Sequence, residues 1–84
     1  MSFHVTWDNE ARKDRAYLWA TAPDPAAVRA ATDAAAAALG RDPYQGTTHL
    51  SEGLWRLIVP PVMVYFEIDH AGRQVTITDV LPAP

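Results

Sequence analysis

The chain contains no cysteine in its 84 residues. This absence excludes disulfide bonds, thiolate nucleophiles and cysteine-based zinc sites, and in so small a protein it favours a reducing compartment, so we expect a cytoplasmic protein. No segment approaches the roughly 18 consecutive apolar residues that span a membrane. The first residues also lack the basic stretch and apolar run of a secretion signal. We therefore expect neither secretion nor membrane insertion.

Positive charge is also scarce. The chain has 7 lysines and arginines against 10 aspartates and glutamates, which gives a formal net charge of −3. Nucleic-acid-binding domains usually carry a basic excess, because they neutralise phosphates. Autonomous affinity for nucleic acid is therefore disfavoured, although Arg12, Lys13 and Arg15 form a local basic cluster. We interpret this cluster as a candidate contact for a protein partner or a nucleic acid.

The sequence lacks the motifs of metal binding and of nucleophilic catalysis. His4, His49 and His70 lie far apart, without the short spacing of metal ligands, and no glycine-rich phosphate loop or nucleophile elbow occurs. Glu67 and Asp69 lie two residues apart, which places two carboxylates on one face of a strand. Aspartate commonly begins a tight turn, so a structural role is favoured for this pair. We expect no metal and no cofactor.

The length permits one hydrophobic core. A chain of 84 residues buries only about 60–65% of its unfolded surface, which is too little to divide between two domains. Hydrophobic residues make up 49% and charged residues 20% of the chain, an ordinary composition for a folded domain. The sequence therefore predicts a single domain over residues 1–84.

The first twenty residues predict a strand followed by a helix. Polar and apolar residues alternate over residues 2–7, which is the period of a strand with one buried face. Asp8 then offers a side-chain oxygen as an N-cap. Apolar residues at helical spacing predict a first helix from about Asn9 to Ala20.

A second helix is indicated by a new start signal. Asp24-Pro25 places a capping acid before a proline at the first helical position. The interior from Ala26 to Leu39 is rich in alanine, the best helix former. Gly40 is expected to supply the left-handed residue that closes the helix. The small side chains favour a hairpin of two closely packed helices.

The second half of the chain predicts a β-meander. Arg41 to Gly53 is rich in turn formers and reads as a loop. Leu54 to Val59 and Val62 to Ile68 are dense in β-branched and aromatic residues, and residues 75–80 continue this pattern after a tight turn. We therefore expect an α+β fold in which a strand, a two-helix hairpin and a three-stranded antiparallel meander follow one another, with the meander packed on the helices.

Two residue pairs on the predicted strands are candidates for contacts. In Trp55-Arg56, an arginine on an exposed sheet face offers a planar guanidinium to a phosphate or to a partner's carboxylate. The alternative is a solvated arginine that lies over a neighbouring aromatic ring. Tyr65 and Phe66 are adjacent and must point to opposite faces, so one belongs to the core and the other is a candidate interface residue.

Three stretches carry a resemblance to a known family. They are Gly53-Leu54-Trp55-Arg56-Leu57-Ile58-Val59, Val64-Tyr65-Phe66-Glu67-Ile68-Asp69 and Arg73-Gln74-Val75-Thr76-Ile77. Together with the order of the predicted elements they resemble the RelE/ParE family of bacterial toxins. The resemblance covers nearly the whole chain, through motifs that are short and hydrophobic.

The resemblance implies a toxin of a type II toxin–antitoxin module of the kind linked to plasmid stabilisation. It implies an antitoxin that wraps the toxin and fills an apolar groove, and a target that is either translating mRNA at the ribosome or DNA gyrase. Arg56 is the residue carried over from the family pattern as a candidate catalytic residue. Met63 stands where RelE-like ribonucleases carry an arginine, and residues 80–84 lack the family's frequent His-Arg or tyrosine.

Three hypotheses follow from these residues. The first is a toxin that acts by binding, with Arg56, Trp55 and the basic cluster as contacts. The second is a ribosome-dependent mRNA endoribonuclease, against which Met63 argues, because a thioether cannot stabilise phosphoryl charge. The third is a catalytically inactive protein–protein interaction module that retains the scaffold.

Overall fold

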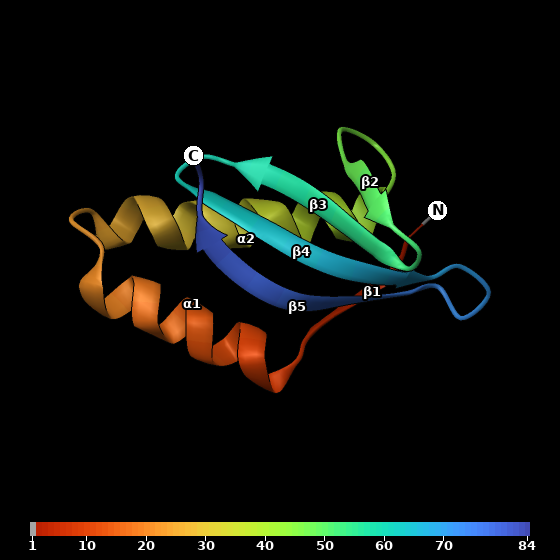
Figure 1. Cartoon of the computed structure of the whole chain (residues 1–84), viewed down its shortest axis with the longest axis horizontal. Helices are drawn as coiled ribbons and strands as arrows, with labels where there is room; N and C mark the ends of the chain where they lie inside the picture. Colours follow the sequence, from red (N-terminus) through yellow and green to blue (C-terminus); the bar gives the residue numbers. More distant parts are fainter. Residues whose placement is uncertain (1) are drawn as a thin grey trace.

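Two helices pack on one face of a five-stranded mixed sheet (Figure 1). The computed structural model describes residues 2–84. The sheet order is β1-β5-β4-β3-β2, with β1 parallel to β5 and the other pairs antiparallel. The α+β class is confirmed. The elements are β1 (His4–Trp7), α1 (Asn9–Thr21), α2 (Pro25–Arg41), β2 (Thr48–Ser51), β3 (Leu54–Val59), β4 (Val62–Asp69) and β5 (Gln74–Pro82).

Both helices begin at the caps that the sequence predicts. The Ala11 N–H donates to Oδ1 of Asp8 at 2.9 Å, and the Ala27 N–H donates to Oδ1 of Asp24 at 3.1 Å. Each bond satisfies a first-turn donor that has no partner within its own helix. The first helix ends at Thr21, one residue beyond the predicted end.

The prediction that Gly40 closes the second helix is wrong. The helix runs through Gly40 to Arg41, and the left-handed glycines are Gly46 and Gly53, with φ of 71° and 77°. The Gly40 carbonyl accepts a hydrogen bond from the Phe3 N–H at 2.7 Å, so this residue connects α2 to the segment leading into β1. A side chain there would begin 3.6 Å from the Phe3 carbonyl oxygen, an ordinary van der Waals contact.

The predicted loop from Arg41 to Gly53 contains a strand, which corrects the strand count of the sheet. β2 pairs with β3 through Thr48–Arg56 and His49–Trp55, with an irregular register before Ser51. All four residues of β2 are exposed, so no buried face produced an alternating pattern. With β1 added in parallel to β5, the expected three-stranded meander is the centre of a larger sheet.

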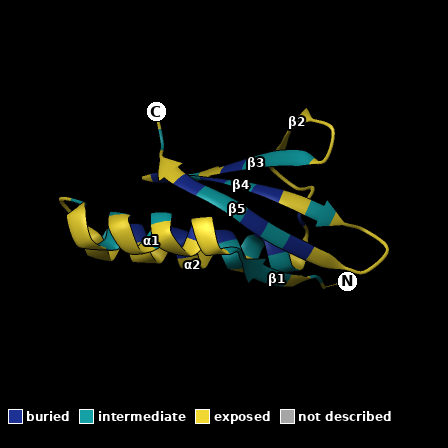
Figure 2. Ribbon diagram, turned by 60° about the horizontal axis from the view of Figure 1, so that its bottom comes forward, coloured by how far each residue is buried: buried dark blue, intermediate teal, exposed yellow. Residues whose placement is uncertain are grey.

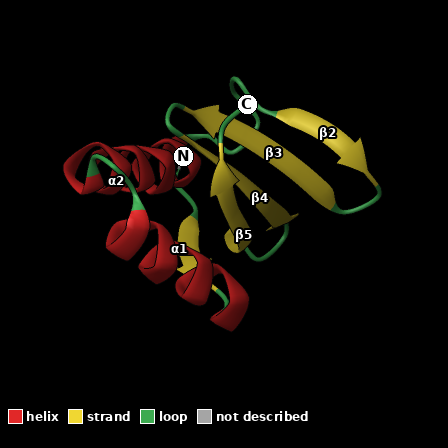
Figure 3. Cartoon of the chain, turned by 60° about the vertical axis from the view of Figure 1, so that its left-hand side comes forward, coloured by secondary structure: helices red, strands yellow, loops and turns green. Residues whose placement is uncertain are grey.

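The hydrophobic core lies between the helices and the sheet (Figures 2 and 3). Side chains with even numbers in β4 face the helices, and Val64 and Phe66 are completely buried. Of the adjacent aromatic residues, Phe66 is the core residue and Tyr65 lies on the other face. The buried hydrophobic residues are Ala11, Val28, Ala31, Ala35, Leu39, Leu57, Val62, Val64, Phe66, Val75, Ile77 and Val80.

β5 changes its neighbour halfway along its length. β1 pairs only with residues 74–77, and the register with β4 shifts between Tyr65 and Phe66. Beyond this bulge the Val80 N–H donates to Oδ2 of Asp14 on α1 at 3.1 Å. A helix side chain therefore replaces a neighbouring strand at this edge. The strand continues through Pro82, into residues where no further structure was expected.

Candidate functional site

The strands β3, β4 and β5 expose one face that no helix covers, here named the open face. In Figure 1 this face points toward the viewer, and α2 passes behind β3 and β4. The core contacts of both helices lie on the opposite side, with Leu57, Val64 and Ile77. Side chains that alternate with these core residues therefore line the open face.

Arg56 lies in a row of polar side chains that crosses the open face. Thr48 pairs with Arg56, Arg56 with Tyr65, and Tyr65 with Asp79. Arg56 is half-buried, and its Nε is shielded from solvent without a hydrogen-bond partner. No ion pair joins its guanidinium to a carboxylate of residues 2–84. Arg56 therefore lies on a sheet face without helix cover, as predicted, and its role as a contact or catalytic residue stays a prediction.

An apolar row lies one step along the strands from the polar row. Ile58 pairs with Met63, and Met63 pairs with Leu81. Ile58 is 42% exposed and Leu81 is 41% exposed, and their pairing through Met63 makes these side chains neighbours on one face. The sequence reasoning considered Met63 only as a missing cation and did not identify the row. The sequence could have placed Ile58 on the open face, because it follows Arg56 by two residues and side chains two apart on a strand point to the same side.

The two rows combine one arginine, one carboxylate and an apolar surface. Asp79 accepts a hydrogen bond from the Thr78 hydroxyl at 3.1 Å. In the polar and apolar rows Arg56 is the one cation, and neither row contains a histidine. Phosphoryl transfer requires positive charge around the reacting phosphate and a group that moves the proton. The rows provide one fixed cation and an apolar surface beside it.

The predicted basic cluster lies on α1, on the helical side of the molecule, away from Arg56. Arg12 and Lys13 are exposed, and Lys13 forms an ion pair with Glu10 at 3.7 Å. The Arg15 guanidinium lies 4.5 Å from the ring centre of Trp7 and 4.9 Å from that of Trp19. Stacking on two indoles holds this charge against the surface. Arg12, Lys13 and Arg15 therefore lie on the same helix, but only Arg15 packs on aromatic rings in this way.

Trp55 faces the helices, although its neighbour Arg56 lies on the open face. It pairs with buried Phe66 and packs edge-on against Tyr44, with ring centres 5.4 Å apart. The ring of His49 lies 4.6 Å from that of Trp55, at a tilt of 36°. His70 contacts the same cluster through a 2.9 Å hydrogen bond between its Nδ1 and the Tyr44 hydroxyl. Two of the three histidines therefore belong to an aromatic cluster. Among the described residues no group of three metal-ligating side chains occurs.

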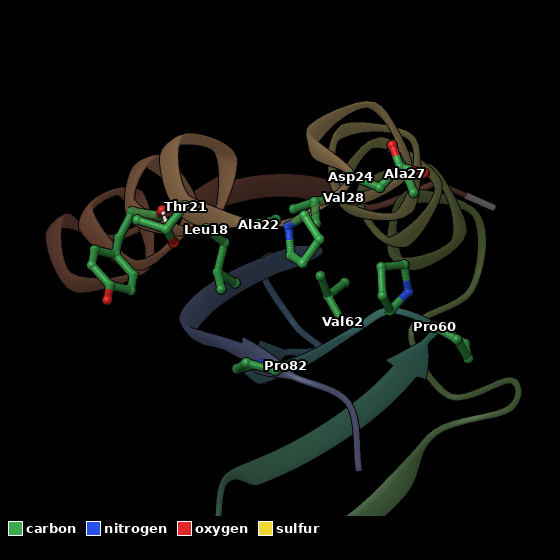
Figure 4. A pocket seen from close by; sticks show the side chains of 12 residues that line it. Leu18, Thr21, Ala22, Asp24, Ala27, Val28, Pro60, Val62 and Pro82 are labelled. Carbon is green, nitrogen blue, oxygen red and sulfur yellow. Dashed lines mark hydrogen bonds between the residues drawn. The ribbon is translucent and has the colours of Figure 1, made fainter.

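An apolar groove of about 750 Å³ lies between the helical hairpin and one end of the sheet (Figure 4). It is bounded by the connection from α1 to α2 on one side and by the turn from β3 to β4 on the other. Tyr17 at its rim is 68% exposed. Sequence reasoning did not find this groove, because its walls come from distant segments. The lining residues are Tyr17, Leu18, Thr21, Ala22, Pro23, Asp24, Ala27, Val28, Pro60, Pro61, Val62 and Pro82.

Comparison with known proteins finds similarity at the level of structure. No family model matches the sequence, and no curated protein matches it. A chain of the toxin–antitoxin complex RelBE2 from Mycobacterium tuberculosis superposes with a TM-score of 0.83 at 21% identity, over 99% of this chain and 100% of that one. The ParDE system from P. aeruginosa gives 0.72 at 16% identity, over 99% and 98% of the two chains.

A third similar structure is described as a toxin alone. The YoeB/ParE toxin from Agrobacterium tumefaciens has a TM-score of 0.71 at 16% identity, over 98% of this chain and 100% of that one. The superpositions span whole chains, so they include the helical hairpin, the sheet and the parallel β1–β5 pair. The two helices, the five-stranded sheet and these superpositions together establish that the chain has the RelE/ParE toxin fold.

Proposed function

We propose that this protein is the toxin of a type II toxin–antitoxin module and inhibits growth by binding its target through the open face. The observation that carries the proposal is Arg56. A guanidinium without an ion-pair partner in residues 2–84 lies at the centre of an exposed sheet face, on the fold of RelE/ParE toxins. Folding alone does not require an unpaired arginine at this place, because its shielded Nε costs stability.

Binding is favoured over RNA cleavage as the mode of action. Met63 occupies the position beside Arg56 on the open face where a ribonuclease of this fold would need a second cation. The target belongs either to the translation machinery, as a ribosomal surface with its mRNA, or to DNA gyrase. The proposal places the protein in the cytoplasm, where both targets occur; no helix of residues 2–84 is long and apolar enough to cross a membrane.

A cognate antitoxin is the second partner of the proposal, and the apolar groove is the surface that favours it. Its lining is almost entirely apolar, and the exposed Tyr17 ring lies at its rim. Apolar grooves of this kind accept one face of an amphipathic helix. Two of the similar structures, RelBE2 and ParDE, are toxin–antitoxin assemblies. An antitoxin helix seated between Leu18 and Val62 would cover this surface.

The test is growth of a bacterial culture after tightly controlled induction of the chain. We expect the wild type to arrest growth and Arg56→Ala to abolish the arrest at an equal protein level. Arg41→Ala, which removes an exposed arginine in the last turn of α2, is the matched control and is expected to arrest growth like the wild type. Mapping of transcript ends in the same samples separates the mechanisms. Intact transcripts during arrest support binding, whereas codon-specific cuts support an endoribonuclease.

The runner-up function is a protein–protein interaction module without toxicity. The apolar row of Ile58, Met63 and Leu81 favours it, because a protein-binding surface needs apolar area more than it needs cations. This hypothesis predicts normal growth for both the wild type and Arg56→Ala. Growth arrest that depends on Arg56 would exclude it.

A further inference from the structure

We infer that the open face binds an acidic amphipathic helix of a partner protein, with a carboxylate on Arg56 and an apolar side chain on the apolar row, and that it discriminates against RNA. The inference rests on the proposed function in one respect, namely that Arg56 contacts the target. It goes further by naming the chemistry that Arg56 meets.

Arg56 accounts for the carboxylate. Its guanidinium has no carboxylate partner among residues 2–84, and the shielded Nε has no acceptor. A partly desolvated cation without a counter-charge is costly, and a ligand carboxylate offsets this cost. The planar fork of arginine binds a carboxylate through two parallel hydrogen bonds, and it binds a phosphate in the same way. The choice between these two ligands therefore depends on the other charges of the open face.

The remaining charges on the open face disfavour RNA. Asp79 lies in the polar row with Arg56, and Glu67 lies on the same face, two residues after Tyr65 and paired with Thr76. Two carboxylates therefore accompany one cation. A surface that binds RNA must neutralise several phosphates. A protein helix needs to place only one carboxylate near Arg56 and leaves Asp79 and Glu67 in solvent.

The apolar row explains why the ligand needs an apolar side chain and a helical conformation. Ile58 follows Arg56 by two residues on β3, so the two side chains lie about 7 Å apart along the strand. Side chains three or four residues apart on a helix lie about 5–6 Å apart, so an acid and an apolar residue one turn away reach both rows. Three strands span about 10 Å, which is the width of one helix.

Selection of helical peptides from a randomised phage-displayed library on the folded chain tests the inference. Enriched peptides of about 16 residues are synthesised, and the affinity of each is measured for the wild type and for every variant. We expect Arg56-dependent peptides to carry Asp or Glu three or four positions from Leu, Ile or Phe. The affinity of the tightest peptides should fall about tenfold or more in Arg56→Ala and in Ile58→Ser, and stay unchanged in Arg41→Ala. Circular dichroism and thermal unfolding verify that each variant is folded.

A labelled single-stranded RNA of about 20 nucleotides provides the second arm, at a salt concentration of about 0.15 M. The wild type is expected to bind this RNA at least about tenfold more weakly than it binds the best peptide. Met63→Arg adds a second cation to the face and is expected to strengthen RNA binding. RNA binding by the wild type that equals or exceeds peptide binding would overturn the inference.

Failure of the inference and failure of the proposed function give different results. If no Arg56-dependent peptide emerges, or if such peptides lack the acidic residue, the inference is wrong even where induction arrests growth. If peptides bind as expected and the culture grows normally after induction, the toxin proposal is wrong, but the inference that the open face binds an acidic helix still holds.

Discussion

The two faces of the sheet are built from the same strands but serve different purposes. On the covered face, Leu57, Val64 and Phe66 alternate into a core that two helices complete. On the open face, Arg56 and Tyr65 occupy the intervening positions. A single strand such as β4 therefore carries core residues on one side and the proposed recognition surface on the other. We expect substitutions on the two faces to separate stability from function.

The largest expected effect is on the covered face, at Phe66, which is completely buried. Phe66→Ala is expected to lower the free energy of unfolding by about 3–5 kcal/mol, because it leaves a cavity in the core. Tyr65→Ala, one residue away on the open face, is expected to cost at most about 1 kcal/mol. Urea denaturation of both variants measures the difference. Equal losses would refute the division of the sheet into two faces.

A smaller effect is expected where α1 replaces a strand beside β5. Asp14→Ala removes the acceptor of the Val80 N–H and is expected to cost about 1–3 kcal/mol, because a partly buried donor loses its partner. Asp14→Asn keeps a carbonyl oxygen and should recover most of the loss. Asp33→Ala, at an exposed position on α2, is the control and should change little. The three midpoints of urea unfolding decide the outcome.

The covered face also depends on the start of α1. Asp8→Ala removes the side-chain acceptor of the Ala11 N–H and is expected to cost about 1 kcal/mol. Asp8→Asn, which retains an amide oxygen at the cap, should cost less. Thermal unfolding followed by circular dichroism measures both variants. No change in either one would mean that the packing of α1 alone maintains its first turn.

Substitution of Arg56 is expected to have the smallest effect on stability. The same substitution is expected to have the largest effect on function. Arg56→Leu removes the unpaired Nε and adds an apolar side chain next to Ile58, so the free energy of unfolding should change by no more than about 0.5 kcal/mol. The same variant should fail to arrest growth. A loss of stability as large as that of Phe66→Ala would identify Arg56 as a structural residue and would contradict its proposed role.

Sequence reasoning predicted the elements that have an amphipathic period and missed those that do not. The helices follow from caps, helical spacing and alanine content, β1 from alternation, and β3 and β4 from their density of β-branched and aromatic residues. All four residues of β2 are exposed, and the strand forms by pairing with β3. Its sequence therefore has no alternation of polar and apolar residues. The parallel pairing of β1 with β5 likewise depends on the complete fold, because no local signal connects Val5 to Val75.

The candidate site shows the same limit. Alternation placed Arg56 on a sheet face and separated Tyr65 from Phe66, and the structure confirms both. It did not reveal that Met63 and Leu81 continue an apolar row from Ile58, because that row needs the register of three strands. The groove beside Tyr17 is formed by segments that meet only in the folded chain.

The pairing of β1 with β5 has a consequence for folding during synthesis. The first strand of the chain receives its partner only after residues 74–77 have been made, and closing so long a loop is entropically costly and slow. Val75 and Ile77, both completely buried, are also supplied by this last strand. A nascent chain that ends before Gln74 lacks the centre of its core and the Asp79 end of the polar row. The open face is therefore complete only after β5 has been synthesised.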